Sequence, residues 1–109
     1  MGALRDKTCQ PQSGAALTRA AAETLLREIP GWELDAAATA IHRQYKFGNY
    51  YETLAFVNAL AWIVHREDHH PDLEVGYNRC TVRFSTHSVK GLSENDFICA
   101  AKISALRGD

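Results

Sequence analysis

The sequence predicts an α+β domain, a single four-stranded antiparallel sheet with three helices packed on one face, in the order α-β-β-α-β-β-α. Apolar and polar residues alternate in segments 41–47 and 80–86, and helix signals stand before, between and after the extended segments. The length of 109 residues fits one domain, and 46% hydrophobic with 23% charged residues is typical of a folded globular chain.

The N-terminal third predicts an arm and then a helix. Residues 1–16 contain glycine, proline, glutamine and serine without an apolar period, so we expect a flexible arm before a domain over residues 17–109. Thr18 is a good N-cap for a helix that continues through Arg27. Pro30 ends this helix because proline moves the preceding residue out of the helical region.

The middle of the chain predicts two strands and a long helix. An extended stretch begins at residues 32–34, and the alternation over 41–47 predicts a half-buried strand. Gly48 breaks that strand, and Asn49 is suited to cap a helix over about residues 50–66. Apolar residues at helical spacing give this helix a wide stripe that faces the core.

The last third predicts a hairpin and a helix. Residues 73–77 and 80–86 form its strands, with the turn at 78–79. Ser93 and Asp96 have the spacing of a capping box, which begins a helix through Leu106. We expect this helix to carry an exposed apolar face that oligomerisation buries.

Several side chains are predicted to serve packing alone. Cys80 and Cys99 occur in apolar patterns, which indicates small buried residues. A core or an interface is the expected place of four aromatic residues, Trp32, Phe56, Trp62 and Phe84.

Composition excludes several classes of protein. Twelve Lys and Arg against thirteen Asp and Glu give a net charge of −1, which argues against a nucleic-acid partner. The longest apolar run, residues 60–64, is far shorter than the ~20 residues that cross a bilayer, so no membrane association is expected. The N-terminus lacks the features of a secretory signal, and three cysteines without a CxxC pair favour the cytoplasm.

The candidate catalytic residues of this sequence are mainly histidines. His65, His69 and His70 lie within six residues, and His87 is expected to end the last strand. Imidazole has an unperturbed pKa of ~6.5, so it both donates and accepts protons near neutral pH. General acid–base catalysis without a metal is one interpretation of this cluster.

Two other interpretations compete with catalysis. His65 and His69 would share one face of a helix and suit Zn²⁺, but Glu67 and Asp68 do not match either zinc-protease motif. A polar helix end also explains His69 and His70, since histidine favours the C-terminal dipole. The same holds for Asp96, because a capping-box carboxylate needs no catalytic role.

The histidine segment resembles the signature of the pterin-4a-carbinolamine dehydratase family. Seven positions of that signature occur here with every gap in register: His65, His69, His70, Pro71, Tyr77, His87 and Asp96. The resemblance also includes residues 44–47, 85–87 and 91–93, and it extends over about residues 17–107.

The resemblance implies an enzyme that uses neither a metal nor an organic cofactor. Family members dehydrate 4a-hydroxytetrahydrobiopterin to quinonoid dihydropterin, which recycles the pterin cofactor of aromatic amino-acid hydroxylases. They share the predicted fold and assemble as homodimers or homotetramers. Some relatives are dimerisation partners of a transcription factor, so a non-catalytic interaction partner of a regulatory protein is the alternative function.

The resemblance also implies residue roles. His69 and His87 would carry protons, and His70 would orient the substrate with a share in catalysis. Substrate binding would fall to His65, Asp68, Pro71, Leu73, Ser85, Thr86 and Ser88, with Asp96 and Tyr77 in support. A strand aromatic such as Tyr77 is more often structural.

Two residues depart from the family pattern. Relatives often have glutamate at the position of His65, and a neutral imidazole would not tune His69 as a carboxylate does. We therefore expect a shifted pH optimum. Relatives often carry an aromatic residue where this chain has Leu73, which predicts weaker stacking on the pterin.

Overall fold

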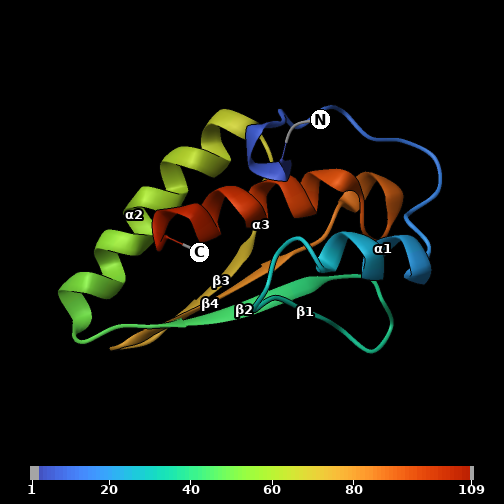
Figure 1. Cartoon of the computed structure of the whole chain (residues 1–109). Helices are drawn as coiled ribbons and strands as arrows, with labels where there is room; N and C mark the ends of the chain where they lie inside the picture. Colours follow the sequence, from blue (N-terminus) through green and yellow to red (C-terminus); the bar gives the residue numbers. More distant parts are fainter. Residues whose placement is uncertain (1–2, 109) are drawn as a thin grey trace.

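The computed structural model describes residues 3–108, so predictions for residues 1, 2 and 109 lie outside the described part. Figure 1 shows the elements along the chain. Their bounds are η1 Leu4–Asp6, α1 Arg19–Leu26, β1 Glu33–Leu34, β2 Ile41–Lys46, α2 Tyr50–Glu67, β3 Asp72–Val75, β4 Arg79–Phe84, η2 His87–Val89 and α3 Glu94–Leu106.

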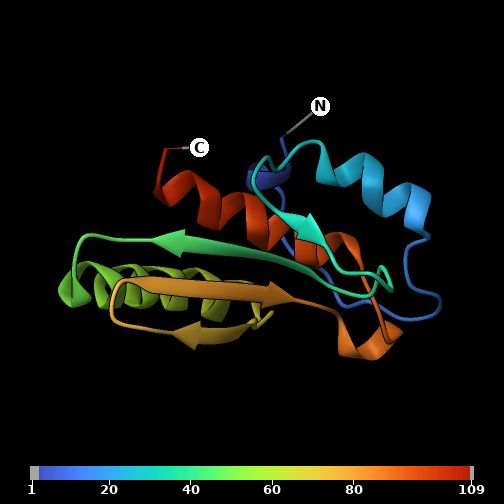
Figure 2. The ribbon, with the colours of Figure 1, turned by 90° about the horizontal axis from the view of Figure 1, so that it is seen from below.

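The four strands form one antiparallel sheet with the order β1-β2-β4-β3. β2 pairs with β4 over six residues each, from Ile41 opposite Phe84 to Lys46 opposite Arg79. Figure 2 shows β4 between β2 and β3, with α2 behind these three strands. The predicted α+β class, with three helices on one face of a four-stranded antiparallel sheet, is confirmed.

Local capping signals set the starts of the three helices, as predicted. The Thr18 hydroxyl accepts a hydrogen bond from the Ala21 amide at 3.1 Å, and the Asn49 side chain accepts one from the Glu52 amide at 2.9 Å. Ser93 and Asp96 form a reciprocal capping box at the start of α3. Each cap satisfies a backbone donor that the helix itself leaves unpaired.

The last hairpin is shorter than the predicted one. β3 ends at Val75, and the Gly76 amide donates to the Arg79 carbonyl at 2.8 Å across the turn. Tyr77 therefore lies in the turn and not in a strand. His87 lies in η2 and not at the end of β4, because the strand stops at Phe84.

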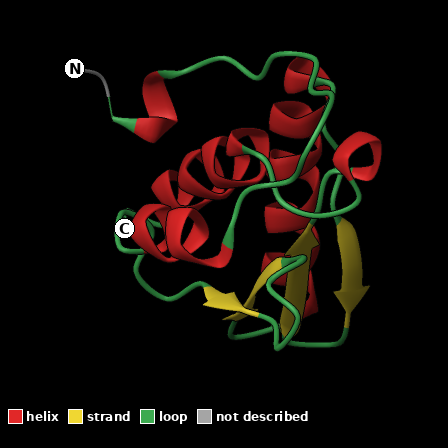
Figure 3. Ribbon diagram, turned by 90° about the vertical axis from the view of Figure 1, so that its right-hand side faces the viewer, coloured by secondary structure: helices red, strands yellow, loops and turns green. Residues whose placement is uncertain are grey.

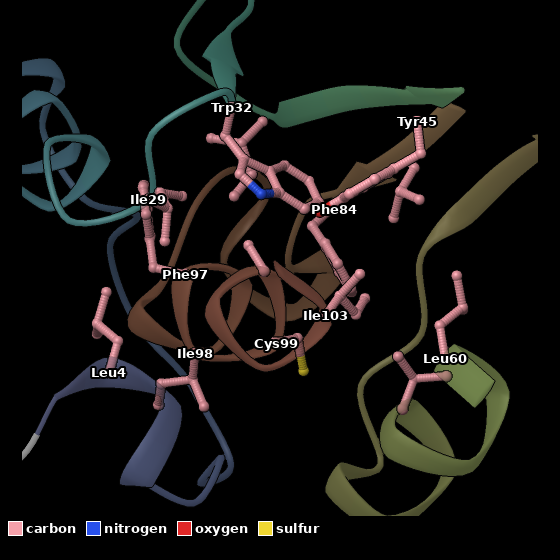
Figure 4. Close-up of a cluster of buried hydrophobic side chains, with 14 of the residues drawn as sticks. Leu4, Ile29, Trp32, Tyr45, Leu60, Phe84, Phe97, Ile98, Cys99 and Ile103 are labelled. Carbon is pink, nitrogen blue, oxygen red and sulfur yellow. The ribbon is translucent and has the colours of Figure 1, made fainter. Parts of the chain in front are cut away.

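α3 forms the centre of the core, which contradicts the predicted exposed apolar face. Phe97 and Ile103 have no exposed surface, and Ile98 is 2% exposed. Figure 4 shows these side chains around α3, with Leu4 of η1 on the outer side of the helix. The N-terminal segment and the sheet together cover α3, so the exposed large apolar side chains belong mainly to α2 and the β3–β4 hairpin: Tyr50, Tyr51, Leu54, Trp62, Leu73, Val75 and Tyr77.

Trp62 is accordingly not a core residue, whereas Trp32, Phe56 and Phe84 are buried. Cys80 and Cys99 are fully buried, as predicted. Burial raises the pKa of the Cys80 thiol above its ordinary value.

The N-terminal segment packs against the domain, and the prediction of a flexible arm misses these contacts. Leu4 is buried at 4% exposure, and the Lys102 ammonium donates to the Arg5 carbonyl at 2.7 Å. Figure 3 shows η1 and the segment that follows it on the helical side of the molecule, away from the strands. None of the helices in residues 3–108 is long and apolar enough to cross a membrane.

Candidate active site

A cleft of about 470 Å³ lies where the N-terminal segment, the end of α2, the segment after β4 and the start of α3 meet. The N-terminal segment is distant in sequence from the other three regions. The lining of the cleft consists of Cys9, Gln10, Pro11, Gln12, Glu67, Asp68, His69, His70, Ser85, Thr86, His87, Ser88 and Asn95.

The end of α2 presents His69 to the cleft. Asp68 takes a left-handed conformation with φ 52°, which aspartate tolerates better than most residues. The Asp68 amide donates to the His65 carbonyl, and the His69 amide donates to the Val64 carbonyl, both at 3.2 Å. This pair of bonds is a Schellman motif. It ends the helix and turns the chain so that His69 reaches α3.

His69 is held against a buried carboxylate. Its Nε2 atom lies 2.6 Å from Oδ1 of Asp96, whose side chain has no exposed surface. The His69 ring also lies nearly parallel to the Phe84 ring, at a centroid distance of 5.7 Å and an interplanar angle of 8°. The His69 side chain is only 11% exposed. Two contacts therefore fix both the position and the plane of this imidazole.

The bonds around Asp96 determine which His69 nitrogen carries the proton. Asp96 Oδ2 accepts from the Thr86 hydroxyl at 2.8 Å and from the Ser93 amide at 2.9 Å. An ionised carboxylate is an acceptor only, so in neutral His69 the Nε2–H donates to Asp96. The Nδ1 atom is then the proton acceptor of the ring. Asp96 thus caps α3 and orients His69 at the same time.

A closed loop carries His87 into the cleft. The Thr86 amide donates to the Gly91 carbonyl at 2.7 Å, and the Gly91 amide donates back at 3.3 Å. Lys90 completes the loop in a left-handed conformation with φ 55°. The His87 side chain is exposed at the start of η2. This loop replaces the sheet edge as the element that positions His87.

The structure brings most of the predicted site residues together. The cleft contains seven of them: Asp68, His69, His70, Ser85, Thr86, His87 and Ser88. Asp96 lies behind them against His69. His65, Pro71 and Leu73 are not among the lining residues. Tyr77 stacks on Tyr50 at a centroid distance of 6.1 Å, in the turn where β3 and β4 meet, so it does not belong to the cleft.

The structure does not have the geometry that the zinc interpretation requires. α2 ends at Glu67, so His69 lies beyond the helix and does not share a helical face with His65. Among residues 3–108, no group of three or more His, Cys, Asp or Glu side chains is arranged to hold a metal ion.

Sequence reasoning missed one wall of the cleft. Segment 9–12, Glu67 and Asn95 line the cleft, although none of them belongs to the predicted site. The N-terminal segment offers no periodic signal. Asn95 lies within the predicted capping box, where a polar residue needs no further explanation.

Comparisons with known proteins identify the family to which this chain belongs. Residues 15–106 match the family described as "Pterin 4 alpha carbinolamine dehydratase". A "Putative pterin-4-alpha-carbinolamine dehydratase" from Stenotrophomonas maltophilia (strain K279a) is 60% identical over 105 residues, which cover 94% of this chain and 90% of the relative. A protein of the same name from Xanthomonas campestris pv. campestris (strain 8004) is 59% identical over 105 residues, which cover 94% of this chain and 89% of the relative.

Two solved structures share the fold. A transcriptional coactivator/pterin dehydratase from Brucella melitensis superposes with a TM-score of 0.81 at 33% identity, covering 85% of this chain and 99% of that chain. A pterin dehydratase-like protein described as a RuBisCO assembly factor in the alpha-carboxysome superposes with a TM-score of 0.63 at 24% identity, covering 72% and 92%. The second likeness concerns the fold alone.

Proposed function

Because this chain belongs to the pterin 4 alpha carbinolamine dehydratase family, we propose that it dehydrates 4a-hydroxytetrahydrobiopterin to quinonoid dihydropterin. The observation that carries this proposal is the His69–Asp96 pair, which lines one cleft together with His70 and His87. Three imidazoles in one cleft supply the proton donors and acceptors that the reaction requires.

The reaction moves two protons and breaks one C–O bond. The 4a-hydroxyl is a poor leaving group, so an acid protonates its oxygen as the C4a–O bond breaks and water departs. The N5–H proton passes to a base, and its electron pair forms the C4a=N5 double bond. One proton enters and one leaves, so the catalyst ends with the same total number of protons.

We assign the base to His69 and the acid to His87. Neutral His69 has its Nε2–H on Asp96, which leaves Nδ1 to accept the N5 proton, and the Asp96 carboxylate stabilises the imidazolium that forms. His87 is exposed on its loop and reaches the cleft from a different element. The opposite stereoisomer of the substrate would exchange the two roles.

The remaining lining residues divide into two groups. Ser85, Ser88 and His70 are exposed in the cleft, so their polar groups are open to the pterin. The Thr86 hydroxyl is already bonded to Asp96 and Ser93, and its backbone pairs with Gly91. We therefore assign Thr86 to positioning Asp96, and not to binding the pterin edge.

The proposal extends to the cellular role. The enzyme would recycle the pterin cofactor of aromatic amino-acid hydroxylases in the cytoplasm, without a metal or organic cofactor of its own. We also propose a homodimer or homotetramer. Support comes from exposed apolar side chains on α2, where Tyr51 is 81% exposed and Trp62 is 65% exposed.

Stopped-flow absorbance tests the proposal. The substrate dehydrates slowly without a catalyst, so the experiment compares its decay with and without protein, before and after treatment with EDTA. We expect acceleration above the spontaneous rate that survives EDTA. Acceleration that EDTA abolishes would contradict metal-free catalysis, and no acceleration would contradict the enzyme.

A second candidate function is a non-catalytic interaction partner of a regulatory protein. The observation that favours it is the exposed aromatic surface of α2, together with the coactivator named among the structural relatives. Absence of acceleration, combined with retained folding, would favour this function over the dehydratase.

A further inference from the structure

One wall of the cleft comes from the N-terminal segment, at Cys9, Gln10, Pro11 and Gln12. This wall belongs to a different part of the chain from the histidines. Gln10 and Pro11 are exposed at the cleft. The conformation of this wall therefore depends on the contacts that hold the segment to the domain.

Asn95 makes two of these contacts. The Gln10 amide donates to Asn95 Oδ1 at 3.1 Å, and Asn95 Nδ2 donates to the Gln10 carbonyl at 2.7 Å. The carboxamide thus pairs with the backbone as a neighbouring strand would. Asn95 is 6% exposed, so both bonds lie where the unpaired groups would be costly.

A further contact ties the same wall to the end of α2. The Cys9 amide donates to Glu67 Oε1 at 2.8 Å. Glu67 is the last residue of α2 and lies two positions before His69. Two separate anchors therefore fix the N-terminal wall relative to the proposed base.

The side chains of this wall suit a pterin. A pterin presents amide-like donors and acceptors along its pyrimidine edge, and glutamine carboxamides complement such groups. Gln12 Nε2 donates to the Gln10 carbonyl at 3.1 Å, so the wall is itself braced by a hydrogen bond. The side-chain oxygen of Gln12, Oε1, remains as a hydrogen-bond acceptor beside the cleft.

We propose that Gln10, Pro11 and Gln12 form part of the pterin-binding site and that Asn95 is the positioning residue that holds them there. This inference rests on the proposed function, since it takes a pterin as the ligand. It assigns to the N-terminal segment a role in affinity, whereas proton transfer stays with the histidines.

The test compares Asn95→Ala with the matched control Asn58→Ala in the full chain. Asn58 is exposed on α2, so the same truncation in a helix leaves the wall intact. The probe is 7,8-dihydrobiopterin, whose Kd is measured by calorimetry. Trypsin cleavage after Lys7, followed by mass spectrometry, reports whether the N-terminal segment detaches.

We expect Asn95→Ala to speed trypsin cleavage after Lys7, to raise the Kd about tenfold, which corresponds to ~1.4 kcal/mol, and to raise KM with kcat within about threefold. Asn58→Ala should change none of these values by more than about twofold. Faster cleavage with unchanged Kd and KM would overturn the inference and leave the dehydratase proposal intact. Wild-type protein that binds no pterin would overturn both.

The cysteines provide a rescue experiment. Cys9 Sγ lies 3.6 Å from Cys99 Sγ in a non-bonded contact, so the two sulfurs must approach by about 1.5 Å to reach the ~2.05 Å of a disulfide bond. The Cys9 sulfur and burial raise the pKa of the Cys99 thiol, so oxidation of this pair requires an added oxidant. Diamide takes two electrons and two protons from the thiols, forms the S–S bond and becomes a hydrazine.

Oxidation of the Asn95→Ala variant should restore its affinity, because the disulfide pins the wall to α3 in place of the lost hydrogen bonds. The same treatment of an Asn95→Ala, Cys99→Ser double variant should restore nothing. If mass spectrometry finds the disulfide and the Kd stays about tenfold weaker than that of wild type, the wall is not the cause and the inference fails.

Discussion

Oδ1 of Asp96 lies 2.6 Å from Nε2 of His69, and the Asp96 side chain is entirely buried. Its other oxygen accepts from Thr86 and Ser93. One carboxylate therefore joins the start of α3, the segment after β4 and the end of α2. Asp96 therefore serves both the start of α3 and the proposed catalysis, so the effects of its substitution on folding and on rate must be measured separately.

Asp96→Asn should lower kcat about 10²-fold or more. The amide still accepts the Ser93 hydrogen bond, but it no longer stabilises an imidazolium and no longer selects the His69 tautomer with a free Nδ1. Steady-state kinetics across pH 5–9 measures the change, and circular dichroism verifies folding. A folded variant with kcat within threefold of wild type would refute the role of Asp96.

His65→Glu should leave the pH profile nearly unchanged, contrary to the expectation from sequence. His65 is exposed on α2 and does not line the cleft, so solvent screens a charge placed there. The kcat–pH profiles of the variant and wild type provide the comparison. A shift of the optimum by a full pH unit would restore the original expectation that residue 65 tunes His69.

Asp35→Asn should destabilise the protein at neutral pH and much less in acid. Burial acts to raise the pKa of Asp35, but hydrogen bonds from Thr39, Ala40 and Arg83 outweigh it and hold the pKa below its usual value. A depressed folded-state pKa gives stability that is present above the unfolded pKa of about 3.9 and is lost as pH falls through the folded value.

Urea unfolding of Asp35→Asn and wild type at pH 7 and near pH 3 measures this effect. We expect a loss of about 1 kcal/mol at pH 7 that shrinks on acidification. An equal loss at both pH values would mean that ionisation of Asp35 contributes nothing.

Ser104→Ala should cost about 1–3 kcal/mol of stability. The Trp32 indole N–H donates to Ser104 Oγ at 2.9 Å, and the Tyr45 hydroxyl lies 3.2 Å from the same oxygen. Ser104 is 5% exposed, so alanine leaves the indole donor buried without this acceptor. Urea unfolding tests it, with the exposed Ser13→Ala as control. A loss equal to that of the control would contradict the prediction.

The sequence predicts well what nearby residues decide. Thr18, Asn49 and Ser93 start helices through bonds that reach two or three residues along the chain. Alternation likewise predicts β2 and β4, although the predicted strands of the last hairpin extend too far, to Tyr77 beyond β3 and to His87 beyond β4. There the turn at Gly76 and the backbone pair of Thr86 with Gly91 decide the local structure.

The N-terminal wall depends on distant partners and escapes such prediction. Gln10 is 85 residues from Asn95, and Cys9 is 58 residues from Glu67. The Asn95 carboxamide and the Glu67 carboxylate hold this segment near the cleft. Such polar contacts need no apolar face on the segment, so its sequence shows no hydrophobic periodicity. The burial of α3 under η1 also depends on a residue distant in sequence, the apolar Leu4, so it could not be inferred from α3 alone.

Stopped-flow kinetics of His69→Ala tests whether this imidazole carries the proposed proton transfer. The matched control is His42→Ala, a half-buried histidine of β2 that pairs with Glu33 and does not line the cleft. We expect His69→Ala to lose about 10²-fold or more of the acceleration over spontaneous dehydration, and His42→Ala to retain it. Full acceleration in folded His69→Ala would exclude His69 as the base of this reaction.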